Sequence, residues 1–278
     1  MSDTVTENYD KYVMYLSTLE GTPIKMLTES LKEVLTDVNI HFGPWGVKIV
    51  DIDPSRMALV QLRLNADRFQ KFHCPKPKIA GVSIMLIQKL LKTVGNNDTL
   101  TMCITKERPD TLEINIHNSK KRIDNYISYN LLDLDFGEIE VPEVQYDATV
   151  TMSCGDFQKY CRELANFSKY VNFYMSRKSF KMKITGDTMS ISQTINIEES
   201  EDSSTILEIN ESAFDGDQVV NIGQFDLKFL NLFCKSSTLC STIKLYLKEG
   251  FPVIIVYSVA SLGTLKSCLN SKEEDLDD

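Results

Sequence analysis

Basic residues recur in pairs at helical spacing along this chain. The pairs are separated by either three or seven residues, and they are Lys25 with Lys32, Lys89 with Lys92, Lys159 with Arg162, and Lys228 with Lys235. At about 3.6 residues per turn, both separations place the two side chains on one face of a helix. Lysines on the polar face of one surface helix are common, but four such faces in an acidic chain indicate a surface that binds the phosphates of DNA or RNA.

The net charge of the chain at first argues against a nucleic-acid partner, because it is formally −9 at pH 7. Net charge governs solubility and long-range steering, however, whereas binding depends on where the cations lie. The acidic residues are concentrated in residues 131–145, residues 197–204 and the C-terminal tail. If the four basic helices lie side by side, we expect one basic surface that binds phosphates with salt-sensitive affinity and little sequence readout.

Catalytic and metal-binding patterns are absent from the sequence. It contains no glycine-rich phosphate loop, no HExxH and no GxSxG, and its three histidines lie in no catalytic pattern. Two aspartate pairs, Asp51/Asp53 and Asp133/Asp135, could be metal-binding carboxylates, but each lies in a stretch better explained as a loop or connector. The sequence therefore predicts a protein that is not an enzyme and that needs no cofactor or metal ion.

Composition is that of an ordinary globular protein inside a cell. The chain has 278 residues, 42% hydrophobic and 25% charged, which suggests about two domains. No apolar run approaches the roughly 20 residues needed to cross a membrane, and the polar N-terminus is not a secretory signal. Seven scattered cysteines without a CxxC pair predict reduced thiols in a reducing compartment.

Hydrophobic periodicity predicts few helices and many strands. The expected helices span Thr22–Leu35, Ile84–Val94, Cys154–Phe167 and Phe225–Lys235, with Thr22 and Ser83 as capping residues of the first two. The expected strands span Gly46–Asp51, Met57–Leu64, Leu100–Thr105, Thr111–His117, Arg122–Asn130, Tyr146–Met152, Phe180–Thr185, Met189–Asn196, Ser241–Leu247 and Val253–Val259. The fold class is therefore α+β.

The order of these elements repeats along the chain. A helix, a polar turn and two strands occupy Ser83–His117, and the same order recurs over Phe225–Val259. Such a repeat predicts an internal duplication with two similar domains, each with two helices packed on antiparallel sheets. We expect the domains at residues 1–130 and 146–270, joined by an extended connector at 131–145 and followed by an acidic tail at 271–278.

Four long stretches resemble one known family. Leu131–Leu164 is similar to the interdomain connector and following helix of proliferating cell nuclear antigen, the eukaryotic sliding clamp. Val50–Leu64 resembles that family's hydrophobic loop and strand, while Gln88–Met102 and Phe229–Leu247 resemble its second and fourth helices. The similarity runs in register from about Tyr12 to Leu269, with enough drift to suit a divergent or viral member.

The resemblance implies the DNA-clamp fold and the function of a polymerase processivity factor. Three identical subunits would form a ring that encircles double-stranded DNA non-specifically, opened by an ATP-dependent clamp loader, in the nucleus or at the replication site of a virus. The eight paired cations fall on positions that line the channel. A subunit of a heteromeric DNA-damage checkpoint clamp, with the same fold but other partners, is the alternative.

The resemblance also implies a pocket that binds a short peptide from DNA polymerase and other replication and repair proteins. The matching positions are Ile52, Arg56, Leu59, Ile139, Val141, Pro142, Pro252 and Leu269. Apolar residues of the connector could equally pin it to the body of the protein. Cys268, Asn270 and Ser271 stand where the family usually has tyrosine, alanine and proline, so the preferred peptide is expected to differ.

Subunit contacts would require sheet edges that pair between copies. By resemblance, Ile123–Tyr129 of one subunit would add to Phe180–Thr185 of the next. The side chains expected at this contact are Ile123, Tyr126, Ile127, Tyr129, Phe180, Met182 and Ile184.

Overall fold

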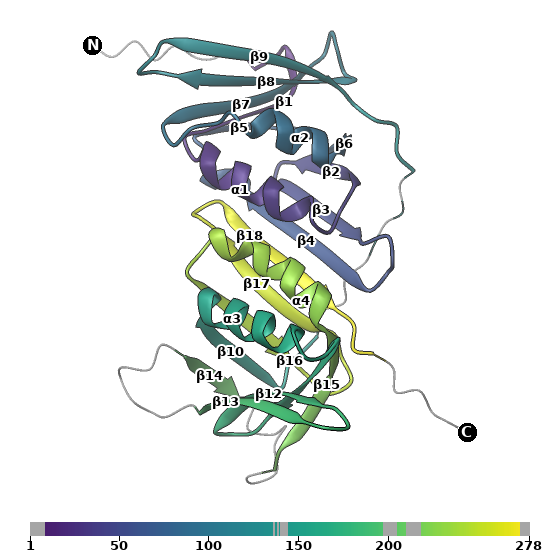
Figure 1. Ribbon diagram of the computed structural model, residues 1–278. Coiled ribbons are helices and arrows are strands. Elements are labelled where there is room, and N and C mark those ends of the chain that lie inside the picture. Colours follow the sequence, from purple (N-terminus) through teal and green to yellow (C-terminus); the bar gives the residue numbers. More distant parts are fainter. Residues whose placement is uncertain are drawn as a thin grey trace. The chain divides into compact units, whose positions relative to one another are not determined.

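Strands are the commonest regular element of the computed structural model (Figure 1). In many of them buried side chains alternate with more exposed ones. The structure describes residues 9–135, 137, 139, 144–196, 205–209 and 218–272. The chain divides into two units: the first comprises Met1–Asp51, Gln61–Glu138 and Val259–Thr264, and the second Ile52–Val60, Ile139–Ser258 and Leu265–Asp278.

The first half of the chain holds strands β1 to β9 and two helices. The strands are β1 (Tyr12–Thr18), β2 (Asp37–Gly43), β3 (Gly46–Ile52), β4 (Ala58–Asn65), β5 (Lys71–His73), β6 (Lys78–Ser83), β7 (Asp98–Thr105), β8 (Thr111–Asn118) and β9 (Ile123–Asn130). The helices are α1 (Gly21–Leu31) and α2 (Ile84–Leu91), with a short 3₁₀ turn η1 (Ala66–Arg68). The strands follow one another in the order β5-β1-β7-β8-β9 in one sheet and β6-β2-β3-β4 in the other.

The second half repeats this composition. Its strands are β10 (Ala148–Ser153), β11 (Tyr170–Met175), β12 (Ser179–Thr185), β13 (Ser190–Asn196), β14 (Ile206–Ile209), β15 (Val220–Asp226), β16 (Thr242–Leu247), β17 (Val253–Val259) and β18 (Gly263–Leu269). Its helices are α3 (Cys154–Ala165) and α4 (Leu227–Phe233), and the latter continues into the 3₁₀ turn η3 (Cys234–Thr238). The strand orders are β14-β10-β16-β17-β18 and β15-β11-β12-β13.

The two halves have the same topology. Each strand of the run β5-β1-β7-β8-β9 has its counterpart in β14-β10-β16-β17-β18, and β6-β2-β3-β4 matches β15-β11-β12-β13 in the same way. The helices occupy matching places as well: α1 follows β1 as α3 follows β10, and α2 follows β6 as α4 follows β15. The predicted α+β class and internal duplication are therefore confirmed. The domain boundaries expected at the connector stay a prediction.

Helix α1 forms because its apolar residues recur at helical spacing. Ile24, Leu27 and Leu31 are all buried, and they share one face. The helix starts at Gly21, one residue before the predicted capping residue Thr22, whose hydroxyl instead donates to Asn96 Oδ1 at 3.2 Å. Thr22 is therefore not the cap. The regular helix also ends at Leu31, before the predicted end at residue 35.

The remaining helices differ in how they begin. Ser153 Oγ accepts from the N–H of Asp156 at the start of α3, and Asp226 Oδ1 accepts from the N–H of Lys228 at the start of α4. Such caps satisfy backbone donors that have no partner within the helix. Ser83 occupies the cap position of α2, but its side chain makes no capping hydrogen bond. The predicted capping role of Ser83 is therefore wrong.

The two cores differ in chemistry. In the first unit, apolar side chains of both sheets and both helices meet, among them Leu16, Leu27, Phe42 and Ile84, all at most 2% exposed. The second unit is centred on an aromatic cluster. The Phe173 ring lies 5.2 Å from that of Phe180 and 4.9 Å from that of Phe225, and all three are fully buried. Burial of each such ring contributes roughly 1.5–3 kcal/mol.

Candidate nucleic-acid interface and partner surfaces

The eight paired cations lie on the helices or in the turns directly after them. Lys25 lies in α1, Lys89 in α2, Lys159 and Arg162 in α3, and Lys228 in α4. Lys32 and Lys92 are the C-cap residues directly after α1 and α2, whereas Lys235 lies in η3. Seven of the eight directly follow a buried residue, the exception being Lys159. Since successive helical residues differ by about 100°, a side chain next to a buried residue leaves the helix outside its buried face.

Helix packing brings the helices that carry these cations together in pairs within each unit. Helix α1 packs against α2, and α3 packs against α4 and η3 (Figure 1). Helix α2 contains no acidic residue, and neither does α4. Each unit therefore presents a pair of neighbouring helices with exposed cations, which is the arrangement expected of a surface that contacts phosphates without reading bases.

Two of the cations have an acidic neighbour. Lys32 Nζ lies 4.0 Å from a carboxylate oxygen of Glu33, and Lys159 Nζ lies 4.0 Å from one of Glu163. Exposed pairs of this kind contribute about 0–1 kcal/mol, so each lysine can exchange its carboxylate for a phosphate at small cost.

Lys25 has a structural role that the sequence did not reveal. Its Nζ donates to the carbonyl oxygen of Val94 at 3.2 Å, and its side chain is half-buried. Val94 lies just beyond α2, where carbonyl groups lack partners within the helix. Lys25 therefore fastens α1 to the end of α2 and is less available to a ligand than the seven exposed cations.

Residues of the predicted peptide pocket differ in how far they are exposed to solvent. Ile52 and Arg56 are exposed, while Leu59, Ile139 and Pro252 are half-buried. Leu269, in contrast, is 0% exposed because its side chain is enclosed by the core, and its place in the lining of the pocket stays a prediction. Val141 and Pro142 lie outside the described residues.

The loop that carries Arg56 is organised by one buried carboxylate. Asp53 Oδ1 accepts from the N–H of Ala58 at 2.6 Å, and Oδ2 accepts from the N–H of Ser55 at 2.9 Å and from its hydroxyl. These bonds close a tight turn in which Arg56 adopts a positive φ of 60°. The carbonyl of Met57 then accepts from the N–H of Asn270 at 3.2 Å. Asp53 therefore positions the loop, as expected of a loop residue and not of a metal ligand.

Hydrogen bonds also set the ionisation of Asp53. Burial by itself would raise the pKa of its carboxyl, but the hydrogen bonds from Ser55 and from the backbone at Ala58 and Met57 outweigh burial. The pKa of Asp53 therefore lies below its ordinary value of 3.8. A carboxyl with a lowered pKa in the folded state stabilises the fold above its unfolded pKa, and the contribution is lost as pH falls through the folded value.

Replacing Asp53 with alanine is expected to lower the free energy of unfolding at pH 7 by about 1–3 kcal/mol, because buried N–H donors lose their acceptor. Urea unfolding measures this difference, which should shrink as the pH falls below 3.8, the ordinary pKa of the carboxyl. Ser55→Ala is the matched control, since it removes only the hydroxyl donor and should cost less. A stability of Asp53→Ala equal to that of the unmodified chain would contradict the assigned role.

Strand β9 lies at an edge of its sheet, beside β8 alone. Tyr126 is 78% exposed and Ile123 is 47% exposed, whereas Tyr129 is buried and its hydroxyl accepts from the N–H of Ser83 at 2.9 Å. Tyr129 therefore fixes β9 to the start of α2. Its side chain is therefore used within the chain, and its predicted contact with another subunit stays a prediction.

The prediction that Phe180–Thr185, in β12, is the other contact strand is wrong. Strand β12 pairs with β11 on one side and with β13 on the other, so it offers no free edge. Its side chains Phe180, Met182 and Ile184 are at most 3% exposed and lie in the core. The edge strand of this sheet is β13, whose residues alternate between exposed and half-buried.

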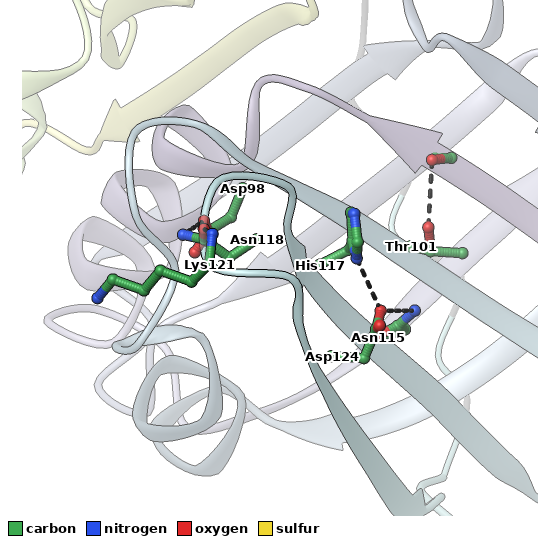
Figure 2. A network of polar contacts seen from close by, with 8 residues as sticks. Asp98, Thr101, Asn115, His117, Asn118, Lys121 and Asp124 are labelled. Atoms are coloured by element: carbon green, nitrogen blue, oxygen red, sulfur yellow. Dashed lines mark hydrogen bonds and ion pairs between the residues drawn. The ribbon is translucent and has the colours of Figure 1, made fainter.

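Polar side chains hold the β8–β9 hairpin in place (Figure 2). Asp98 accepts from the N–H of Gly95 at 2.8 Å and from Asn118 Nδ2 at 2.6 Å, and Asn118 Oδ1 accepts from the N–H of Lys121. Further along, His117 Nδ1 lies 2.9 Å from Asp124 Oδ1, across the ladder from it. These contacts depend on strand register and were not predicted from sequence.

All seven cysteines are free thiols. Among the residues that the structure describes, no group of three or more histidine, cysteine or carboxylate side chains could hold a metal ion. Within the same residues, no helix has the length and apolar character needed to span a membrane.

Comparison with known proteins agrees with this geometry. The family model for the N-terminal domain of proliferating cell nuclear antigen matches residues 14–139. The family model for the C-terminal domain matches residues 140–272. The probable DNA polymerase sliding clamp 1 of Paramecium bursaria Chlorella virus 1 is 32% identical over 259 residues, which cover 92% of this chain and 96% of that protein. The chain therefore belongs to the proliferating cell nuclear antigen family and has the DNA-clamp fold and the function of a sliding clamp.

Proposed function

We propose that three copies of this chain close head to tail into a ring around duplex DNA and hold a DNA polymerase on its template. The observation that carries this proposal is that all eight paired cations lie on the four helices or directly after them, and that seven of the eight are exposed. Two units of the same topology in each of three subunits would line a channel with twelve helices bearing such cations.

Contacts of this kind suit sliding. Lysine is a flexible point charge that binds phosphate without fixing a base, so each contact is weak and interchangeable along the duplex. A ring with many such contacts holds DNA by its closed topology, and no single phosphate has to be bound tightly. The acidic remainder of the surface would repel DNA from the outside of the ring.

Ring closure is proposed through the two edge strands. Strand β9 of one copy would pair with β13 of the next, in place of the buried β12. The sequence of β13, SISQTIN, contains no charge, and Ile123 of β9 is exposed. An uncharged, exposed edge is an aggregation hazard unless it is paired, and a head-to-tail contact that closes after three copies pairs β9 and β13 of every copy.

Partners would be held at the loop organised by Asp53. Exposed Ile52 and Arg56 beside half-buried Leu59 and Pro252 fit a short peptide with an apolar anchor, supplied by a polymerase or another replication or repair protein. An ATP-dependent loader would open the ring. Sliding clamps are processivity factors, and we assign this chain no catalytic role; it would act in the nucleus or at the replication site of a virus.

Retention on DNA with blocked ends tests the proposal. The protein is mixed with a linear duplex, both ends are then blocked with biotin and streptavidin, and the sample is washed with salt high enough to screen phosphate contacts. We expect the protein to stay on the blocked duplex and to leave when an internal restriction site is cut. Equal loss from blocked and open duplexes would show that it does not encircle DNA.

A further inference from the structure

Four of the cysteines gather in the second unit, around the first turns of α3 and the turn η3. Cys154 is the first residue of α3, and its Sγ lies 4.0 Å from the Sγ of Cys240. Cys161 of α3 and Cys234 of η3 are buried in the same unit. Tyr257 of β17 is 1% exposed, and burial, with the nearby thiols, raises the pKa of its hydroxyl.

Backbone pairing holds Cys154 and Cys240 next to each other. In the β10–β16 ladder, Ser153 lies opposite Thr242, and one residue further the N–H of Cys154 donates to the carbonyl of Ser241 at 2.9 Å. Cys240 is therefore fixed next to the start of α3 by strand register. Cys154 is buried, whereas Cys240 is half-buried and can be reached by a small molecule from solvent.

We propose that Cys240 and Cys154 form a peroxide-sensitive thiol pair, in which Cys240 is oxidised first and Cys154 then joins it in a disulfide. This modification site is separate from the clamp function and does not depend on ring formation. The proposal rests on the close approach of the two sulfur atoms and on the different exposure of the two side chains.

The surroundings of the pair favour Cys240 as the reacting thiol. The hydrogen bond from Cys154 lowers the pKa of Cys240 to about 7, with burial opposing and the backbone at Ser258 and Thr242 assisting. The same hydrogen bond, with burial, raises the pKa of Cys154. A thiolate is the nucleophilic form of cysteine, so at neutral pH Cys240 reacts and Cys154 stays protonated.

The reaction has two steps. The thiolate of Cys240 attacks one oxygen of hydrogen peroxide, the O–O bond breaks, and the leaving hydroxide takes a proton to become water, which leaves a sulfenic acid. The sulfur of Cys154 then gives up its proton and attacks the sulfur of Cys240, the S–O bond breaks, and a second water leaves. The two thiols lose two electrons, and peroxide is reduced to two waters.

Formation of the bond requires the sulfur atoms to approach from 4.0 Å to about 2.05 Å. Cys240 lies between η3 and β16, outside any helix or strand, so its side chain can rotate without breaking a regular element.

Cys103 provides a matched control within the same chain. It is also half-buried, but its neighbour is a carboxylate instead of a second thiol. Its Sγ, in β7, is 3.8 Å from a carboxylate oxygen of Glu113. Burial, with the carboxylate of Glu113, raises the pKa of Cys103 to about 11, although Lys11 opposes the rise. Because the thiolate fraction outweighs the weaker nucleophilicity of a low-pKa thiol, iodoacetamide at pH 7 should label Cys240 on the order of a hundredfold faster than Cys103.

Peptide mass spectrometry of the full chain tests the pair directly. After hydrogen peroxide, we expect a Cys154–Cys240 disulfide that dithiothreitol reverses. The bond should be absent from Cys240→Ser, and Cys154→Ser should stop at the sulfenic acid, trapped by dimedone on Cys240. Cys103→Ser should behave like the unmodified chain. Labelling of Cys240 no faster than Cys103, or no disulfide in the unmodified chain, would overturn the proposal without bearing on clamp function.

Discussion

Reversal of Lys89, Lys92, Lys159 and Arg162 to glutamate is expected to abolish stimulation of a DNA polymerase on primed DNA while leaving the fold intact. All four side chains are exposed, so their replacement removes no buried contact. Each substitution replaces attraction to a phosphate with repulsion, and in a ring it is repeated in every subunit. The dependence of DNA binding on salt should also weaken, with a slope smaller by about 0.9 for each phosphate that is no longer neutralised.

The control must carry the same change in net charge on other surfaces. Lys76, Lys106, Lys244 and Lys266 are also exposed but lie outside the helices. Their reversal should leave stimulation close to that of the unmodified chain, and circular dichroism with thermal unfolding checks the fold of both variants. Unchanged stimulation by the helix variant, or an equal loss in the control, would place the DNA contact elsewhere.

The helices could be predicted from sequence because amphipathic spacing is a local property. Their ends could not be predicted as well. The pattern that suggested a helix to residue 35 arises because Leu35 is buried after the regular helix has ended at Leu31. Helix α4 was placed too early because Phe225 and Asp226 belong to β15, and Asp226 caps the helix that follows.

Short strands were missed for a related reason. Strands β5 (Lys71–His73) and β14 (Ile206–Ile209) are three and four residues long, too short for a period of two to stand out. Each is held at the edge of a sheet by its partner strand, β1 or β10. Their formation depends on that pairing and not on their own sequence.

In the candidate surfaces, too, local features could be predicted from sequence and long-range contacts could not. The helical spacing of the paired cations is a local property, so these cations could be identified from sequence. The bond from Lys25 to the carbonyl of Val94 joins residues 69 positions apart and depends on how α1 and α2 pack. No local pattern could show it.

The mistaken contact strand shows what the sequence did contain. Strand β12 alternates apolar residues that fill the core, Phe180, Met182 and Ile184, which is the pattern of an interior strand. Strand β13 places serine, glutamine, threonine and asparagine around two isoleucines, which is typical of a strand with one partner. Alternation was sufficient to find both strands, but which of them lies at the edge is decided by the order of pairing.

Replacing both Ile123 and Tyr126 with aspartate is expected to convert the proposed trimer into monomers. Both residues lie on the edge strand β9 and are exposed, at 47% and 78%. Two added carboxylates beside Asp124 would have to be desolvated against a neighbouring strand, which is how natural edge strands resist pairing. Light scattering at low micromolar concentration should show a mass near three times 31.6 kDa for the unmodified chain and near 31.6 kDa for the variant.

Ile206→Asp is the matched control, because Ile206 is 56% exposed and lies on β14, an edge strand with no part in the proposed contact. It should keep the larger mass. The thermal midpoint of the double variant, measured against that of the control, separates loss of assembly from loss of fold, since exposed substitutions usually change stability by within about 0.5 kcal/mol. A trimer that survives both aspartates would mean that the subunits meet through another edge, and a monomeric unmodified chain would favour a heteromeric ring.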